Sequence, residues 1–158
     1  MNQLTIFLAG CVLALGCIIP LRADAQVVLT EVQPLTFGTM IMTSFATPVQ
    51  VVVHPQNILP NYSGPVIPTV MGSRGHYNMT GAPPNTPFTI TYYNIIDAAY
   101  GGNPQLTLDN FTFEPAVLVT NGGGVADFFI GARMTSVGGG SPYGDGTYLG
   151  NYSFDINF

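Results

Sequence analysis

The sequence has 158 residues and a net charge of −5 at pH 7, and only 7% of its residues are charged. It contains no lysine, and beyond residue 25 its arginines are Arg74 and Arg133. A nucleic-acid-binding domain needs a basic face, so this composition excludes nucleic acid as a partner. Few charges together with abundant glycine, proline and aromatic residues favour an all-β extracellular domain over a helical or cytosolic one.

The first 25 residues are predicted to be a signal peptide. Ile6–Leu21 is an almost unbroken apolar run, and Ala23-Asp24-Ala25 ahead of Gln26 has the small-residue pattern of a cleavage site. Cleavage there leaves residues 26–158, a single domain by length, with no membrane segment and no cysteine. Two alternatives remain open: a membrane anchor, which Pro20 disfavours, and lipidation at Cys11, which lies early in the apolar run.

Short stretches of β-branched and aromatic residues recur along residues 26–158 and predict seven to nine strands. The nine candidate strands are Gln26–Val32, Leu35–Phe37 with Gly38 free to turn, Pro48–His54, His76–Thr80, Phe88–Tyr93, Leu106–Phe113, Ala116–Thr120, Val125–Met134 and Thr147–Phe158. The proline-rich stretch Pro55–Gly75 is expected to be a surface excursion with at most edge pairing, at Val66–Met71. Between them, Ile95–Tyr100 is predicted to form one short helical turn. Closely spaced strands without intervening helices predict an antiparallel β-sandwich, with a barrel as the lesser possibility.

Two of these segments alternate between apolar and polar residues with a period of two. In Val125–Met134 the even positions are apolar: Ala126, Phe128, Ile130, Ala132 and Met134. In Thr147–Phe158 the even positions are apolar or glycine: Tyr148, Gly150, Tyr152, Phe154, Ile156 and Phe158. This alternation predicts strands with one face in a core. Since fraying the last segment would expose its aromatic side chains, the rest of the chain is predicted to supply the sheet with which it pairs.

No catalytic, cofactor-binding or metal-binding residue is predicted. His54 and His76 lack the spacing of a zinc site, and Ser141 has no nucleophile motif around it. The carboxylates fall at turns or on polar strand faces: Asp97, Asp109, Glu114, Asp127, Asp145 and Asp155. An exported hydrolase is kept as a hypothesis because sequence alone does not place these groups in space. A Ca²⁺ site at Gly144-Asp145-Gly146 with Asn151 and Asp155 is a further alternative, since hard cations take oxygen ligands.

Five segments carry a resemblance to a known family. They are Leu35-Thr36-Phe37-Gly38, Tyr77–Pro83 leading into Phe88–Ile90, Leu106–Phe111, Asp127–Ala132 and Gly146–Tyr152. In this order and spacing they resemble a bacterial family of exported, pilin-like and Ig-like β-sandwich domains of unknown function, distantly like spore-coat-U-type and archaic chaperone–usher subunits. The resemblance covers Leu35–Phe158 and implies an Ig-like sandwich without known catalytic residues. The chain departs from fimbrial subunits in its short segment ahead of the first strand and in Asn157, where those subunits commonly carry an aromatic residue.

These observations favour an exported, non-enzymatic structural or surface-adhesion protein, found in the periplasm, at the cell surface or outside the cell. The alternative is a sugar- or calcium-binding lectin-like module in which exposed aromatic side chains stack on sugar rings. The candidate aromatics for that role are Tyr62, Tyr77, Tyr93 and Tyr143.

The expected partners are copies of the chain itself or other surface subunits, joined by β-strand addition. In that hypothesis Gln26–Val32 of a neighbour fills a groove. Its inward residues are either Val28, Thr30 and Val32, or Val27 and Leu29 with Glu31 facing out of the groove's end. In the competing interpretation the same segment is the first edge strand of its own domain and completes a closed sandwich. The shortness of the segment favours the second interpretation.

Overall fold

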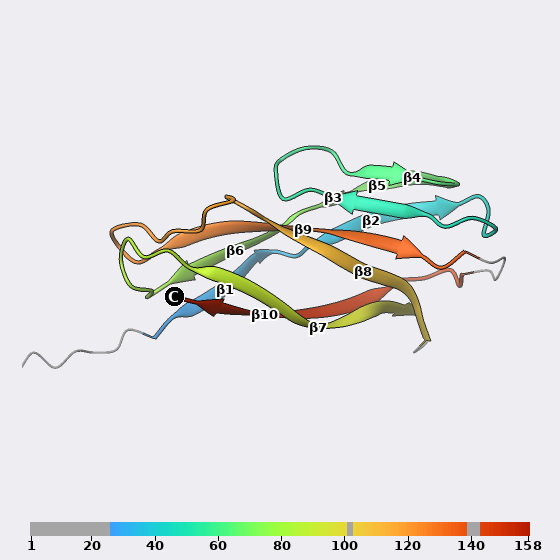
Figure 1. Ribbon diagram of the computed structural model, residues 1–158. Helices are drawn as coiled ribbons and strands as arrows, with labels where there is room; N and C mark the ends of the chain where they lie inside the picture. The colour runs from blue at the N-terminus through green and yellow to red at the C-terminus, as the bar shows by residue number, and fades with distance from the viewer. Residues whose placement is uncertain (1–25, 101–102, 139–142) are drawn as a thin grey trace, which may run out of the picture.

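The computed structural model describes residues 26–100, 103–138 and 143–158. All regular secondary structure within these ranges is β-strand (Figure 1). The strands are β1 (Val28–Gln33), β2 (Thr36–Met42), β3 (Gln50–Val53), β4 (Asn61–Ser63), β5 (Val66–Ser73), β6 (Gly75–Thr80), β7 (Thr89–Tyr100), β8 (Asn103–Glu114), β9 (Ala126–Ser136) and β10 (Leu149–Asn157). The predicted signal peptide, the lipidation alternative at Cys11 and Ser141 all lie outside the described residues.

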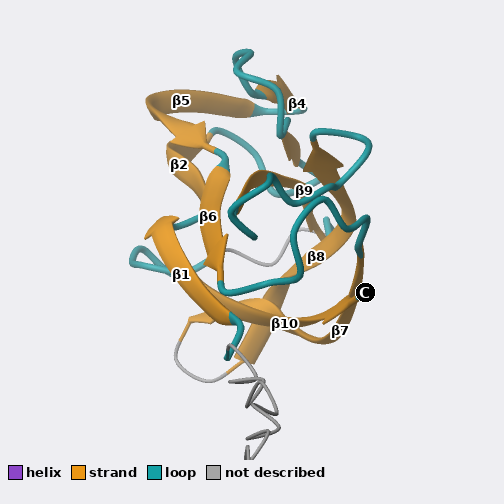
Figure 2. Cartoon of the chain, turned by 90° about the vertical axis from the view of Figure 1, so that its left-hand side faces the viewer, coloured by secondary structure: helices purple, strands orange, loops and turns teal. Residues whose placement is uncertain are grey.

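Eight strands form one antiparallel sheet with the order β1-β6-β9-β8-β7-β10, and β3 joins it by pairing with β9 and β4. The remaining two, β2 and β5, pair with each other as a separate antiparallel hairpin. Figure 2 shows the large sheet curling round, so that β1 and β6 lie across the interior from β7 and β8. The predicted class, an all-β antiparallel sandwich, is confirmed.

Strand β9 lies at the centre of this arrangement. One of its edges pairs with β6 through residues 126–130 and with β3 through residues 132–135, while the other edge pairs with β8. Its even-numbered side chains are all buried, as the alternation predicts: Ala126, Phe128, Ile130, Ala132 and Met134. They pack on Val51 of β3, Met79 of β6 and Leu108 of β8, which makes the inner face of β9 the middle of the core.

Strand β10 also has its predicted apolar face turned inward, but that face is only half-buried. Tyr152, Phe154 and Ile156 pack against the core without being enclosed by it, and Phe158 is 52% exposed. Strand β10 pairs with β7 alone and stands at the end of the strand order. The chain is therefore built around β9, and β10 is one of its edges.

Strand β1 pairs with β6 of its own chain. This is the pairing expected from the interpretation that the shortness of the segment favours. Leu29 lies opposite Met79 and Glu31 opposite Tyr77, so both point toward the interior. It is thus an edge strand of its own domain, and β1 and β10 are the two ends of the strand order.

Three local predictions are wrong. Ile95–Tyr100 does not form a helical turn; it is the second half of β7, and backbone pairing to β8 and β10 keeps it extended. Gly38 does not end its strand; it has a φ of +84°, and β2 continues through it to Met42. A side chain at Gly38 would overlap the Val70 carbonyl oxygen of β5, so the close approach of the two backbones requires glycine. Ala116–Thr120 forms no strand and contributes one bridge, between Val119 and Pro87.

Candidate functional site

The strongest candidate site is the gap between the unpaired edges of β1 and β10, here called the open seam. All pairings along the order β1-β6-β9-β8-β7-β10 are antiparallel, so the two end strands run antiparallel to each other. Figures 1 and 2 both show them near one another on the same side of the molecule. Their facing edges carry backbone N–H and C=O groups without ladder partners in the described chain, which is the feature that lets a sheet accept a further strand.

Side chains bridge the seam where backbones do not. The hydroxyl of Tyr77, on β6, donates to Glu31 Oε2 of β1 at 3.0 Å and lies 2.8 Å from the hydroxyl of Tyr152 on β10. Because an ionised carboxylate only accepts, Tyr77 donates to Glu31 and Tyr152 donates to Tyr77. Burial, the bond with Tyr152 and the nearby Glu31 raise the pKa of Tyr77 well above its usual range, so its hydroxyl keeps its proton. Burial likewise raises the pKa of Tyr152.

The walls of the seam are apolar and incompletely covered. On β10, the ring of Phe154 meets the ring of Tyr77 edge to face, with the two centroids 5.2 Å apart. The ring centroid of Tyr152 lies 5.1 Å from that of Phe111. On β1 every residue is exposed, including Val28 and Leu29. Natural proteins usually protect such edges with charge, proline or a covering segment. On β1 the charge of Glu31 and the register shift between Glu31 and Gln33 give part of this protection, while Val28 and Leu29 stay exposed.

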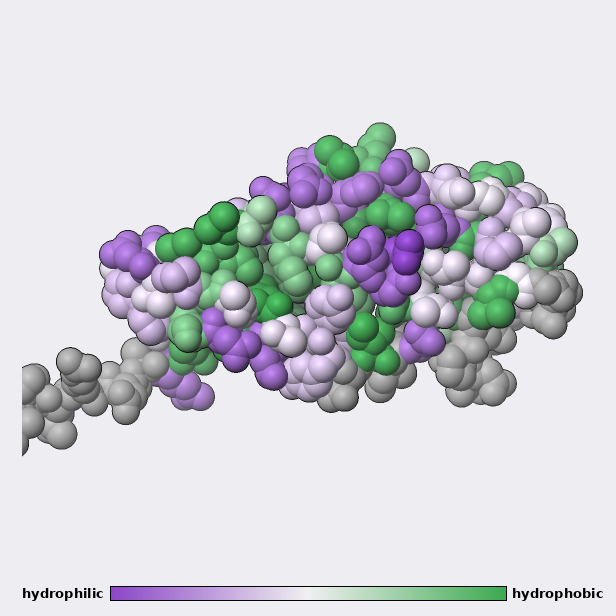
Figure 3. Space-filling view, in the orientation of Figure 1, coloured by the Kyte–Doolittle hydropathy of each residue, from purple (hydrophilic) through white to green (hydrophobic). Residues whose placement is uncertain are grey.

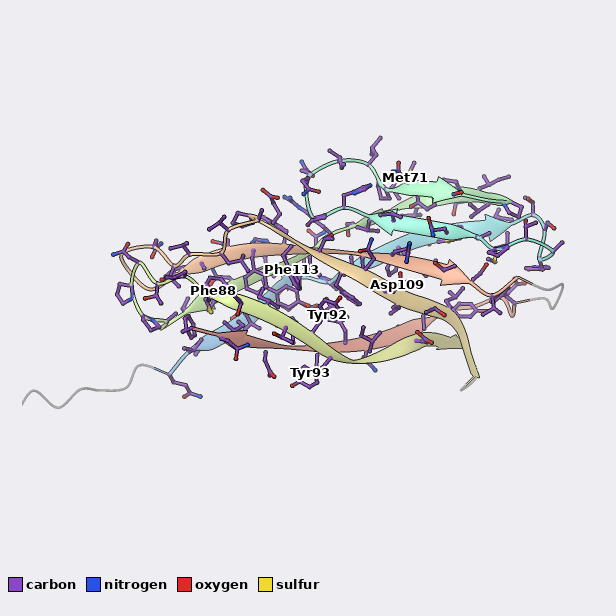
Figure 4. All side chains as sticks on the ribbon, viewed as in Figure 1. Met71, Phe88, Tyr92, Tyr93, Asp109 and Phe113 are labelled. Atoms are coloured by element: carbon purple, nitrogen blue, oxygen red, sulfur yellow. The ribbon has the colours of Figure 1, made fainter. Side chains whose placement is uncertain are left out.

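The four aromatics proposed for sugar stacking occupy different environments. Tyr77 is buried, so the expectation that it is an exposed stacking platform is wrong. The Tyr62 hydroxyl donates to the Phe37 carbonyl and accepts from the Gly72 N–H, and the Tyr143 hydroxyl accepts from the Val137 N–H. Tyr93 is exposed and points away from the sheet (Figure 4). The set does not converge on one surface.

The carboxylates named above have partners that sequence reasoning missed. Asp109 of β8 receives two hydrogen bonds of 2.7 Å from the guanidinium of Arg133, directly opposite on β9. Those bonds lower the pKa of Asp109, and bonds from His76 and Asn78 lower that of Asp127. Opposite charges at outward positions of neighbouring strands would have been the signal, but only once the strand order is known. These pairs are structural contacts between strands.

Three further carboxylates lie in strands or at their ends, and one of them, Asp155 of β10, is hydrogen-bonded with the Tyr93 hydroxyl. Asp97 of β7 accepts a hydrogen bond from the Leu108 N–H on β8, and Glu114 accepts one from the Gln56 side chain. Within the described ranges, no group of three His, Cys, Asp or Glu side chains comes close enough to hold a metal ion. Asp145, at the centre of the calcium alternative, is exposed.

A cavity of about 730 Å³ lies between the β2–β5 hairpin and the segment that leads into β10. Its walls are mainly apolar and include Met40, Phe45, Leu108, Met134 and Tyr148. Sequence reasoning did not find it because the walls come from segments that are far apart in the chain. It offers space for an apolar group, and its lining also includes the Asp145 carboxylate and the hydroxyl groups of Thr36 and Tyr143.

The fold is an antiparallel sandwich in which β1 and β10 each pair along one edge. The chain belongs to the family described as "Domain of unknown function (DUF4402)", whose model matches residues 27–158. No curated protein and no solved structure matches the chain. A search of the described residues finds no helix that is both long and apolar enough to span a membrane.

Proposed function

We propose that this chain is an exported, non-enzymatic structural or surface-adhesion subunit that associates with further copies of itself by β-strand addition at the open seam. The observation that carries the proposal is the seam: β1 and β10 each pair along one edge only, and half-buried aromatic side chains lie between them. Export is supported by the apolar run and cleavage pattern of residues 1–25. The pilin-like resemblance of Leu35–Phe158 points to the same kind of assembly.

Strand β1 keeps its pairing with β6 in this assembly, so it offers only its free edge, and that edge pairs with the free edge of β10 in the next copy. In this mode of recognition main-chain hydrogen bonds give affinity and alternate side chains give specificity. Apolar side chains beside the two edges, such as Leu29 and Ile156, also come together, which gains roughly 25 cal/mol for each Å² of apolar surface removed from water.

The occupant in this proposal is β1 of a second copy. Strand β1 has every residue exposed, pairs only with β6 in the described chain, and has a β-branched residue at every second position: Val28, Thr30 and Val32. A contact between β1 of one copy and the seam of the next joins two different surfaces, so it leaves one of each free at the ends. Such heterologous contacts extend into filaments unless a rotation closes them.

The test is the oligomeric state of purified residues 26–158 across a concentration series, measured by light scattering. We expect assembly that grows with concentration and is lost in Val28→Lys, since lysine on an exposed edge blocks strand pairing. The matched control is Val117→Lys, another exposed valine but in a loop, which should assemble as the wild type does. A wild-type protein that stays monomeric at every concentration overturns the proposal.

Deleting residues 26–32 separates the two roles of β1. A folded monomer that no longer assembles supports donation to a neighbour. A deletion that unfolds the monomer shows instead that β1 is needed against its own β6, and the proposal then has to name another donor strand.

A further inference from the structure

The side chain of Arg74, between β5 and β6, is held in place without an ionic partner. Its Cζ lies 3.6 Å from the centroid of the Phe129 ring, and its Nη1 donates a 2.7 Å hydrogen bond to the Pro55 carbonyl. Neither of the two ion pairs found among the described residues includes Arg74. By contrast, Arg133 donates two hydrogen bonds, from Nε and Nη2, to the carboxylate of Asp109.

This guanidinium therefore keeps donors available in a fixed position. An arginine has five N–H groups, and in the described chain one of those of Arg74 is in a hydrogen bond. Stacking on Phe129 and anchoring at Pro55 remove most of the rotational freedom that a ligand would otherwise have to freeze. A planar guanidinium with free N–H groups is suited to binding a carboxylate through two hydrogen bonds.

Arg74 faces a hollow of about 670 Å³ beneath the loop that joins β3 to β4, a size typical of small-ligand sites. Both histidines of the chain, His54 and His76, line the same hollow. Each is fixed through its Nε2, His54 by Asn61 at 3.3 Å and His76 by Asp127 at 2.9 Å. The hollow thus collects one of the two arginines beyond residue 25 and both imidazoles.

The loop above the hollow adds two kinds of group. Gln56 and Asn57 are exposed amides that can both donate to and accept from hydroxyl groups. Ile58 and Leu59 are apolar and exposed, Leu59 at 74%, with no core to fill. In Figure 3 hydrophobic surface appears at the top of the molecule, over this loop. The lining of the hollow therefore combines a guanidinium, two side-chain amides and two aliphatic side chains. This combination matches a ligand that has an acid group, hydroxyl groups and an apolar C–H face.

We propose that this hollow binds a carboxylated sugar. Arg74 takes the carboxylate, the amides of Gln56 and Asn57 take hydroxyls, and Ile58 and Leu59 cover the apolar face of the ring. The acids nearest to the hollow do not oppose this, because Asp127 is bonded to His76 and Asn78, and Glu114 is bonded to Gln56. Of the two strands that flank the open seam, only β1 contributes to the lining of the hollow, through its last residue, Gln33, so the proposal does not rest on the assembly proposal.

The experiment is a calorimetric titration of residues 26–158 with glucuronate, with glucose and sulfate as parallel probes. We expect saturable binding of glucuronate, and at least tenfold weaker binding of glucose and of sulfate. Arg74→Gln should weaken glucuronate binding at least tenfold, whereas Arg133→Gln, which removes the same charge from the outer face of β9, should leave it unchanged.

Two further results keep the proposal falsifiable if Arg74→Gln loses stability. Asn57→Ala and Leu59→Ser alter exposed loop residues, and each should weaken glucuronate binding severalfold while leaving the melting temperature of the free protein unchanged. Absence of glucuronate binding to the wild type overturns the proposal. Equal losses in Arg74→Gln and Arg133→Gln, or equal binding of sulfate and glucuronate, overturn it as well, because they indicate a non-specific anion effect.

Discussion

Strands β9 and β10 have the same alternating sequence pattern but very different surroundings. Both place an apolar residue at every even position over most of their length. Strand β9 is flanked by β6, β3 and β8, and its inner face is buried, whereas β10 is flanked by β7 alone and its inner face is half-buried. The alternation reports which face of a strand is apolar. How far that face is buried depends on the neighbouring strands, which the pattern does not specify.

The contact between the rings of Phe128 and Phe154 allows the surroundings of β9 and β10 to be compared directly. They are the same residue type, lie on β9 and β10, and meet edge to face with centroids 6.0 Å apart. Phe128 is 0% exposed, whereas Phe154 lies beside the open seam. Truncating either ring removes the same contact, so any difference in cost comes from the rest of its environment.

The largest expected effect is therefore that of Phe128→Ala. It should lower the free energy of unfolding by about 3–5 kcal/mol, the usual cost of emptying an aromatic site in a closed core. Phe154→Ala should cost clearly less, since water can fill the space that the ring leaves at the seam. Urea denaturation of both variants measures the difference. Equal losses would mean that β10 is as well enclosed as β9.

Sequence reasoning identified the strands whose alternation is strong and missed those held by pairing alone. The even positions of residues 126–134 were enough to identify the core face of β9. The run Ile95–Tyr100 has no such alternation, so its extended conformation comes from the strands on either side. Val66–Met71 was expected to reach at most edge pairing because of Pro68, and β5 tolerates this proline because it belongs to a two-stranded hairpin outside the main sheet.

The candidate sites were less predictable than the fold because each depends on strand order. Tyr77 looks like a surface aromatic in sequence, yet β1 and β10 cover it from both sides. The open seam exists because β1 and β10 end the strand order, and no local motif encodes that. Arg74, His54 and His76 meet because the β3–β4 loop folds over the end of β6, and their spacing in sequence follows no binding motif.

A second effect concerns a polar anchor at the end of β9. The hydroxyl of Ser136 accepts a 2.7 Å hydrogen bond from the buried Val49 N–H. Ser136→Ala leaves that N–H without its partner, which should cost about 1–3 kcal/mol of stability. Ser153→Ala, at a half-buried position of β10, is the control and should cost much less. Amide hydrogen exchange at Val49 should also become faster in Ser136→Ala, and an unchanged rate there would contradict the role given to this bond.

A smaller effect is expected from the hydroxyl that links β10 to β6. Tyr152→Phe removes the donor to Tyr77 but keeps the ring, so it should cost about 0.5–1.5 kcal/mol, the net value of a typical hydrogen bond. Tyr92→Phe, at an exposed position of β7, is the matched control and should lie within about 0.5 kcal/mol of the wild type. If the two variants have the same stability, the hydrogen bonds across the seam do not hold β10 in place.

The smallest effect lies on the outer faces of β8 and β9, where Asp109 meets Arg133. A hydrophilic patch appears in Figure 3 at the position where Asp109 is labelled in Figure 4. Hydrogen bonds from Arg133 lower the pKa of Asp109 in the folded protein. The folded state therefore binds a proton at this carboxyl less readily than the unfolded state does, so the pair stabilises the fold above the unfolded pKa of about 3.9.

That contribution should disappear as the pH falls from about 4 through the lower pKa of the folded state. Thermal melts between pH 7 and pH 2 should show a shallower acid decline in Asp109→Asn than in the wild type. The control is Asp155→Asn on β10, since Asp155 belongs to neither ion pair of the described residues. The change should be small, because both partners are largely exposed and water and salt screen their attraction.

Raising the salt concentration should shrink the difference between wild type and Asp109→Asn. A difference that grows with salt, or an Asp155→Asn curve that flattens as much, would mean that the Arg133 pairing does not set the acid decline.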